Sequence, residues 1–306
     1  MIRHDKILAI DDEQKVLDIY RQLLAEDGLE LRTVTGVQQA ADALDEGDWA
    51  IVLLDQRLHG AYGDDEGLEL LPEIERRSPG AKTIVVTGYA SPKAIERAFN
   101  AGVYDYVEKT ENFETLLRAK VRNAAEVARQ QWLTRTSQTE PDAPLAKLWA
   151  EVRNEADRNR KGRLLEDLVE LLFTLVPGLI VAARHRGPDE EFDLIVRNES
   201  RDSLWAKESA IFLVECKNWS SKVGPDELDR FGNKLKRRYG RAKLGFFVAV
   251  NGFTKGFDTT RAATREQDIL VVPLDGSELQ RLVDGPEREA LLKQFYQQAI
   301  EAKAKS

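Results

Sequence analysis

The sequence has few of the residues on which many catalytic and structural sites depend. Its 306 residues include one cysteine, Cys216, and three histidines, His4, His59 and His185. A single cysteine excludes an internal disulfide and any metal site built from several thiolates, which agrees with a reducing compartment. Three scattered histidines also supply little for a histidine-based catalytic or metal site.

Long uncharged apolar runs are missing as well. No stretch approaches the ~20 apolar residues of a membrane span. The opening "MIRHDKILAIDDE" has neither the apolar region nor the cleavage site of a signal peptide. We therefore expect a cytoplasmic protein with no membrane segment, long enough for two domains that each bury a core.

Charge is unevenly shared along the chain. The net charge is -8, with 16 basic and 25 acidic residues in 1–130 but 29 basic and 28 acidic residues in 131–306. An acidic surface repels nucleic acid, whereas a nearly neutral segment can carry a basic face. We expect the two halves to do different jobs.

In the first half, short apolar strands alternate with amphipathic helices. The strands are "KILAI", "LRTVT", "AIVLLD", "TIVVTGY" and "YDYVEK". This alternation predicts a doubly wound, five-stranded parallel sheet. Ligands of such sheets bind at the carboxyl ends of the strands. The residues at those ends are Asp11, Asp12, Asp55, Thr87 and Lys109.

These strand-end residues predict a phosphoryl-transfer site. Three carboxylates in one crevice repel one another unless a cation joins them, and oxygen ligands suit a hard ion such as Mg²⁺. A carboxylate beside Mg²⁺ and a lysine can attack a phosphoryl donor, because both cations neutralise charge on the transferring group. Asp55 is the expected nucleophile.

Over roughly residues 5–125 the sequence resembles the receiver domain of two-component response regulators, which has a flavodoxin-like fold. The resemblance implies that Asp11, Asp12 and Asp55 hold Mg²⁺. It also implies that a histidine kinase or another phosphoryl donor phosphorylates Asp55.

The resemblance further implies that Thr87 and Tyr106 form a switch pair and that Lys109 contacts the phosphoryl group. Two departures are visible. The loop from Asp55 to the glycine that opens the third helix spans twelve residues, more than in most receivers, and adds three acidic residues at 64–66. Thr110 stands where many receivers have a cis-proline, so the backbone there is expected to differ.

The middle of the chain predicts helices. Helical spacing continues from 113 to 132, further than a receiver needs, and "TSQTEPDAP" at 136–144 has the composition of a linker. We assign 1–125 to the receiver, 126–160 to a helical linker and 161–306 to a second domain. The linker is interpreted either as a signalling stalk or dimer contact, or as a spacer helix packed on its own domain.

The second half begins with an amphipathic helix at 162–178. The order that follows is strand, strand, helix, strand, strand. The four strands are "EEFDLIVRN", "AIFLVECKNW", "KLGFFVAV" and "ILVVPLDG". This order predicts a mixed α/β domain with a small central sheet.

The strand "IFLVECK" ends in two opposite charges. Side chains alternate along a strand, so Glu215 and Lys217 share one face, while Cys216 is expected to be a small buried residue on the other. Asp193 opens the neighbouring strand. An acidic pair with a lysine suits Mg²⁺-dependent phosphodiester hydrolysis, because the carboxylates fix the ion and the lysine orients water or stabilises developing charge.

Over roughly residues 160–275 this pattern resembles the PD-(D/E)-x-K nuclease superfamily, and within it the Mrr-like restriction endonucleases with their restriction-endonuclease-like fold. "ECKNW", followed by a glycine and a helix, carries the closest likeness. The literal "PD" at 188–189 is set aside, because Asp193 directly adjoins the apolar strand. The resemblance implies Mg²⁺ ligands at Asp193 and Glu215, and catalytic roles for Asp193, Glu215, Lys217 and Glu166.

The segment "RFGNKLKRRYGRAK" at 230–243 contains seven cationic residues and no acidic one. Phosphate contacts with DNA need such a strip, although a run of like charge can also be a solvated helix face. The predicted nucleic-acid contacts lie in this run: Lys234, Lys236, Arg237, Arg238, Arg241 and Lys243, with Arg230 preceding them.

Together these features predict a Mg²⁺-dependent DNA endonuclease controlled by phosphorylation of Asp55. A role in defence against foreign DNA follows from the Mrr-like resemblance by analogy. The switch would act through a homodimer or by release of an inhibited effector domain. The alternatives are a regulator that binds nucleic acid without cutting it, and a constitutive nuclease with a receiver that only docks.

Overall fold

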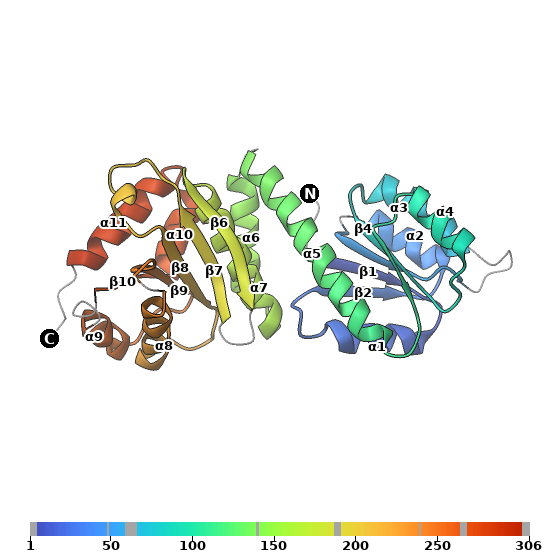
Figure 1. Cartoon of the computed structure of the whole chain (residues 1–306), viewed down its shortest axis with the longest axis horizontal. Helices are drawn as coiled ribbons and strands as arrows, with labels where there is room; N and C mark the ends of the chain where they lie inside the picture. Colours follow the sequence, from blue (N-terminus) through green and yellow to red (C-terminus); the bar gives the residue numbers. More distant parts are fainter. Residues whose placement is uncertain are drawn as a thin grey trace. The chain divides into compact units, whose positions relative to one another are not determined.

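The computed structural model describes residues 5–47, 49–58, 66–138, 141–186, 191–238, 240–263 and 268–301. The chain divides into two compact units, Met1–Thr136 and Ser137–Ser306, and each contains a five-stranded sheet (Figure 1). Across the described part of the chain, no helix is both long and apolar enough to cross a membrane.

The sheet of the first unit is entirely parallel, with strand order β2-β1-β3-β4-β5. Its strands are β1 (Lys6–Ile10), β2 (Glu30–Val34), β3 (Ile51–Leu54), β4 (Lys82–Thr87) and β5 (Asp105–Glu108). The predicted doubly wound sheet is confirmed. Its central strands are apolar throughout because helices cover both of its faces.

Helices cover both faces of this sheet (Figure 1). The elements are α1 (Gln14–Leu24), α2 (Val37–Asp45), the 3-10 helix η1 (Glu66–Leu70), α3 (Leu71–Arg77), α4 (Pro92–Asn100) and α5 (Phe113–Gln138). Leu17 of α1 and Leu117 of α5 belong to one apolar cluster, and Leu44 of α2 and Ile74 of α3 belong to the other.

The sheet of the second unit is mixed, with strand order β10-β9-β8-β7-β6. Its strands are β6 (Leu179–Arg186), β7 (Glu191–Asn198), β8 (Ile211–Lys217), β9 (Leu244–Ala249) and β10 (Leu270–Asp275). The pairs of β7 with β6 and with β8 are antiparallel, and the pairs of β9 with β8 and with β10 are parallel. The mixed sheet is confirmed, but the sequence did not predict β6, an edge strand whose apolar run soon turns polar.

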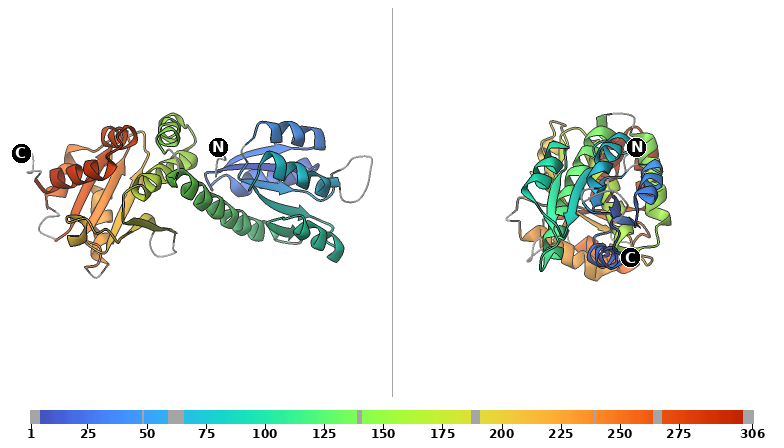
Figure 2. Two further views of the ribbon diagram at one scale, coloured as in Figure 1. Left: turned by 90° about the horizontal axis from the view of Figure 1, so that it is seen from above. Right: turned by 90° about the vertical axis from the view of Figure 1, so that its right-hand side faces the viewer.

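Helices also cover both faces of the second sheet. They are α6 (Asp142–Asn154), α7 (Arg158–Thr174), the 3-10 helix η2 (Trp205–Lys207), α8 (Pro225–Lys236), α9 (Lys255–Ala263), α10 (Gly276–Asp284) and α11 (Arg288–Glu301). Phe231 of α8 packs on Phe247 of β9, with ring centroids 5.3 Å apart. Phe173 of α7 packs on Phe246 from the opposite face at 5.0 Å. Figure 2 shows the orange and red helices of the last third of the chain beside their strands.

The predicted helical linker, residues 126–160, is divided between the two units. Helix α5 continues to Gln138, while α6 packs within the second unit. There the indole nitrogen of Trp149 donates a hydrogen bond to Gln280 at 2.5 Å, and the Arg288 guanidinium contacts the Asp142 carboxylate at 2.5 Å. Helix α6 is therefore a structural part of the second unit.

Candidate functional site

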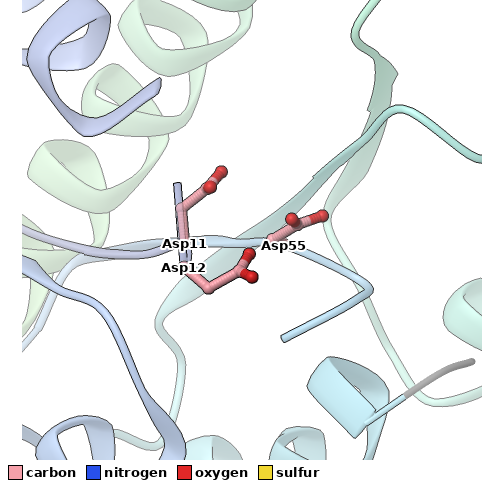
Figure 3. A group of neighbouring side chains, drawn as sticks. All are labelled: Asp11, Asp12 and Asp55. Carbon is pink, nitrogen blue, oxygen red and sulfur yellow. The ribbon is translucent and has the colours of Figure 1, made fainter. Parts of the chain in front are cut away.

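The first candidate site lies where β1 and β3 end. The Asp55 amide donates to the Ile10 carbonyl at 2.8 Å, which places Asp55 beside Asp11. Asp11 and Asp55 are buried and Asp12 is partly exposed, and one carboxylate oxygen from each lies within 4.8 Å of the others (Figure 3). This oxygen-only donor set fits a hard divalent cation.

Lys109 completes this site from the end of β5. Its ammonium nitrogen lies 2.7 Å from Asp11 Oδ2 and 3.2 Å from Asp55 Oδ2. The position is set by the backbone, because the Lys109 amide donates to the Thr87 carbonyl at 2.7 Å. The Tyr20 hydroxyl of α1 donates a hydrogen bond to Asp11 Oδ2 at 3.3 Å.

Burial changes the acidity of the predicted phosphoryl acceptor. The pKa of Asp55 is raised to about 6, first by burial and then by repulsion from Asp11, while Lys109 acts to lower it. The attraction of Lys109 thus offsets only part of the desolvation cost. A cation held by the three carboxylates would favour the ionised form, which is the form that can attack phosphorus.

The predicted switch residues lie on β4 and β5. Thr87 is buried, and its hydroxyl oxygen accepts a hydrogen bond from the Tyr89 amide at 3.1 Å. The Tyr106 hydroxyl donates a hydrogen bond at 2.6 Å to Oε1 of Gln56, the residue that follows Asp55. Gln56 was not predicted, because nothing in a single sequence distinguishes it from other loop residues.

The enlarged loop after Asp55 falls mostly outside the described residues, which omit 59–65. Where the chain is described again, Gly67 packs directly on Asp55. A Cβ atom at Gly67 would lie 1.8 Å from the Asp55 carbonyl oxygen, and the Gly67 amide donates to the Gln56 carbonyl at 2.9 Å. Described residues contain no cis peptide bond, including the bond before Thr110.

The second candidate site lies at the adjoining ends of β7 and β8. Leu194 pairs with Val214, so Asp193 and Glu215 adjoin at the edge of the ladder. Asp193 Oδ2 accepts a hydrogen bond from the Cys216 amide at 2.6 Å. Glu215 and Lys217 lie together, as strand alternation predicts: the Lys217 ammonium lies 2.6 Å from Glu215 Oε1.

A second lysine reaches Glu215 from α8. Lys234 Nζ lies 2.8 Å from Glu215 Oε2, so each carboxylate oxygen of this buried glutamate holds one lysine. Sequence analysis predicted Lys234 as a DNA contact and did not predict this ion pair. In the structure, Lys234 belongs to the carboxylate site.

Asp193 is a weaker acid than an exposed aspartate. Its pKa is raised to about 7 by burial and by Glu215 and Glu166, against the lowering effect of Lys217. Glu166 therefore acts on Asp193 from α7. Among the described residues, however, Asp193, Glu215 and Glu166 do not form a group as tight as the three aspartates of the first unit.

Cys216 differs in part from the expected core residue, because it is partly exposed as a whole residue. Burial raises the pKa of its thiol well above the ordinary value, and Asp193 and Glu166 raise it further. The thiol therefore stays protonated and is not suited to nucleophilic attack.

The predicted basic strip lies at the end of α8 and in the following turn. Arg230 pairs with Glu227 at 2.7 Å, and Lys243 pairs with Asp268. Arg238 is half-buried, and Tyr239 lies outside the described residues. The exposed cationic residues of the strip are Arg230, Lys236, Arg237, Arg241 and Lys243.

Comparison with known families gives two matches, one within each structural unit. Residues 7–121 match the family described as response regulator receiver domain. Residues 158–283 match the family described as restriction endonuclease. The first match includes Asp11, Asp55, Thr87 and Lys109, and the second includes Glu215 and Lys217.

Individual relatives cover the first unit. An NtrX-like response regulator of Rickettsia bellii is 30% identical over 123 residues, which are 40% of this chain and 25% of that protein. The alginate biosynthesis regulator AlgB of Pseudomonas aeruginosa is 29% identical over 107 residues, 35% of this chain and 23% of AlgB. This chain thus spans about a quarter of the length of these relatives.

Solved structures that match also cover the first unit. A CheY-like receiver domain protein of Methanospirillum hungatei is 30% identical, with 42% of this chain and 98% of that chain covered and a TM-score of 0.37. The NtrX receiver domain of Brucella abortus is 30% identical, with 39% and 98% covered and a TM-score of 0.35. Two family matches on two separate sheets give one conclusion: this chain joins a response regulator receiver domain to an Mrr-like restriction endonuclease domain.

Proposed function

We propose that this protein is a Mg²⁺-dependent DNA endonuclease whose cutting is regulated by phosphorylation of Asp55. The observation that carries the proposal is the cluster at the end of β8. There Lys217 lies 2.6 Å from Glu215, and Asp193 has a pKa raised to about 7 beside them. A carboxylate pair with a lysine is a side-chain set suited to metal-assisted phosphodiester hydrolysis.

Asp193 and Glu215 would hold the Mg²⁺, which when bound polarises the phosphate and lowers the pKa of a water ligand. Burial alone would lower the pKa of Lys217, but Glu215 and Asp193 outweigh burial and raise it. Lys217 therefore stays cationic. It is suited to stabilise negative charge on the phosphate, and not to remove a proton from water.

The two ion pairs of Glu215 oppose this role electrostatically. Its two carboxylate oxygens contact Lys217 and Lys234 at 2.6 and 2.8 Å. Each carboxylate oxygen keeps a second lone pair for a cation, but two neighbouring ammonium groups would repel that cation. Release of one lysine would remove part of this repulsion. Lys234 is the better candidate, because its release would leave Lys217 beside the reacting phosphate.

In the receiver, Asp55 would accept the phosphoryl group from a histidine kinase or another donor. Lys109 already contacts Asp55 at 3.2 Å and would then neutralise the phosphoryl oxygens. Thr87 and Tyr106 would respond to phosphorylation of Asp55. A response of Tyr106 would be seen as loss of its hydrogen bond to Gln56. Control would pass through a homodimer or through release of an inhibited nuclease domain.

A plasmid-cleavage assay with Mg²⁺ tests the enzymatic proposal. We expect the wild type to nick or cut DNA, EDTA to abolish cutting, and Glu215→Ala and Lys217→Ala to lower the rate by about 10²-fold or more. Lys207→Ala, at an exposed position of η2, is the matched control and should cut like the wild type. The proposal fails if the wild type cuts no DNA, or if Glu215→Ala cuts equally well.

A second candidate is a regulator that binds DNA without cutting it. The double ion pair of Glu215 favours it, because a carboxylate held by two lysines needs no metal. Cleavage separates the two: this candidate predicts DNA binding in a gel shift, with or without EDTA, and no cleavage under any metal. A role in defence against foreign DNA would be tested by phage plating with the wild type and Glu215→Ala.

A further inference from the structure

A pocket of about 660 Å³ opens at one edge of the second sheet. Its walls come from α6, from the first turn of α7, and from the segments that follow β8, β9 and β10. These three strands run parallel, so their carboxyl ends share one edge. Pockets of this volume are the size of small-molecule and nucleotide sites.

The pocket adjoins the proposed catalytic centre along the chain. Asn218, which lines it, directly follows Lys217. Val250, which also lines it, donates its amide to the Lys217 carbonyl at 3.2 Å. The pocket therefore lies next to the backbone that carries Lys217.

The charge of the pocket favours an anion. Arg153, Lys161 and Lys222 line it, with Asp275 as the carboxylate among the described lining residues. Asp275 Oδ1 already accepts hydrogen bonds from the Ser277 amide at 2.7 Å and the Glu278 amide at 3.3 Å, as the cap of α10. Its charge therefore stabilises the helix N-terminus, and the lysines and arginine dominate the opening.

The pocket is held in shape by internal hydrogen bonds. The Asn218 side-chain amide donates to the carbonyls of Val152 and Lys161, both at 3.0 Å, and so ties α6 and α7 to the end of β8. Arg153 lies over the Trp149 ring, with its guanidinium carbon 5.4 Å from the centroid. Such a site needs little reorganisation when a ligand binds.

Part of this pocket lies outside the family match. The restriction endonuclease match begins at residue 158, whereas Trp149 and Arg153 belong to α6. Helix α6 is also the first helix after the receiver's α5 in the chain. One wall of the pocket is thus formed by residues that the family match does not include.

We propose that this pocket binds one nucleotide of the substrate DNA strand next to the cutting site, with its phosphate on Arg153, Lys161 and Lys222. The half-buried Phe253 ring offers an apolar surface to the base, and Asn251 and Ser277 offer polar groups to its edge. This proposal rests on the proposed function, because it assigns the ligand as substrate.

Binding of a short fluorescent DNA duplex to the full-length protein in EDTA tests the pocket without cleavage. Arg153→Ala and Lys222→Ala should each weaken binding by about three- to tenfold and reduce the salt dependence by about one phosphate contact. Lys207→Ala, an exposed cation away from the pocket lining, should bind like the wild type. Because Lys222 is exposed, its substitution should leave the fold intact, which circular dichroism checks.

Competition with deoxyadenosine monophosphate distinguishes a nucleotide site from a simple anion site. The nucleotide should displace the duplex from the wild type, more weakly from Lys222→Ala, and at concentrations where inorganic phosphate has no effect. Equal DNA binding by all variants, equal competition by phosphate, or stimulation of cleavage by the free nucleotide would each overturn the proposal. Glu215→Ala protein should show the same pocket dependence, so these results stand whether or not the protein cuts DNA.

Discussion

At the scale of single residues, the two sites share a physical feature. Asp55 and Asp193 are acids whose pKa values are raised to about 6 and about 7, with burial as the largest cause. In each site a lysine lowers the pKa, but the desolvation cost and neighbouring carboxylates outweigh it. A divalent cation bound at either site would therefore relieve this repulsion and favour the ionised carboxylates.

Replacing Asp55 should stabilise the metal-free receiver. Because its folded pKa is raised, the folded state binds more protons than the unfolded state between about pH 4 and pH 6, and the free energy of unfolding falls as pH rises through this window. At pH 7 in EDTA, Asp55→Asn is expected to raise that free energy by about 1–3 kcal/mol, with little effect at pH 4.

Urea unfolding of the wild type and variant at both pH values measures this difference. Glu96→Gln, at an exposed acid on α4, is the matched control and should change little. A variant no more stable than the wild type at pH 7 would show that ionised Asp55 does not destabilise the folded receiver.

Cleavage should depend on pH through Asp193. A carboxylate must lose its proton to bind Mg²⁺, and the pKa of Asp193 is about 7, so Mg²⁺ affinity should rise between pH 6 and pH 8. Below the pKa the change approaches about tenfold per pH unit for one proton. The Mg²⁺ concentration for half-maximal plasmid cleavage measures it, and a flat profile would count against Asp193 as a ligand.

At the scale of secondary-structure elements, the residues predicted best from the sequence are those whose position is set by the end of a strand. Asp11, Asp55 and Lys109 each follow an apolar strand of a parallel sheet, and the topology alone brings such residues to one edge. Glu215 and Lys217 were predicted to share a face because strands alternate with a period of two residues. These rules are local, so one sequence is enough to apply them.

What the sequence missed depends on packing between distant elements. Lys234 sits in a run of cations that resembles a solvated face, and only the packing of α8 on the sheet through Phe231 brings it to Glu215. Helix α6 looked like part of a linker, because its contacts with α10 and α11 come from residues more than a hundred positions later. No local pattern carries that information.

Gly67 packs directly against the backbone of Asp55, the proposed phosphoryl acceptor. A Cβ at Gly67 would lie 1.8 Å from the Asp55 carbonyl oxygen, so Gly67→Ala must push η1 or the end of β3 aside. We expect a loss of about 1–3 kcal/mol in the free energy of unfolding, with slower phosphorylation of Asp55 by acetyl phosphate. Gly36→Ala, where a Cβ meets nothing within 4 Å, is the control and should lose much less.

At the scale of the whole molecule, two units with separate cores are joined through α5 and α6. Each unit can be explained from its own residues, with a proposed phosphoryl-acceptor site in one and a carboxylate–lysine site in the other. The proposed coupling of the two units could not be predicted from either pattern, because it would depend on how phosphorylation of Asp55 acts through the segment that joins them. That coupling is the feature which distinguishes a regulated nuclease from two independent domains.

Coupling predicts that the receiver's state changes the rate of DNA cleavage. With beryllofluoride as a phosphoryl mimic, the full-length protein should change its Mg²⁺-dependent cleavage rate by about fivefold or more, the usual lower size of allosteric coupling. Asp55→Ala should not respond, since the acceptor carboxylate is gone. Residues 137–306 alone should cut at one rate with or without the mimic, because the acceptor site lies in the other unit. Identical rates and identical oligomeric states in all these forms would show that the receiver does not control cutting.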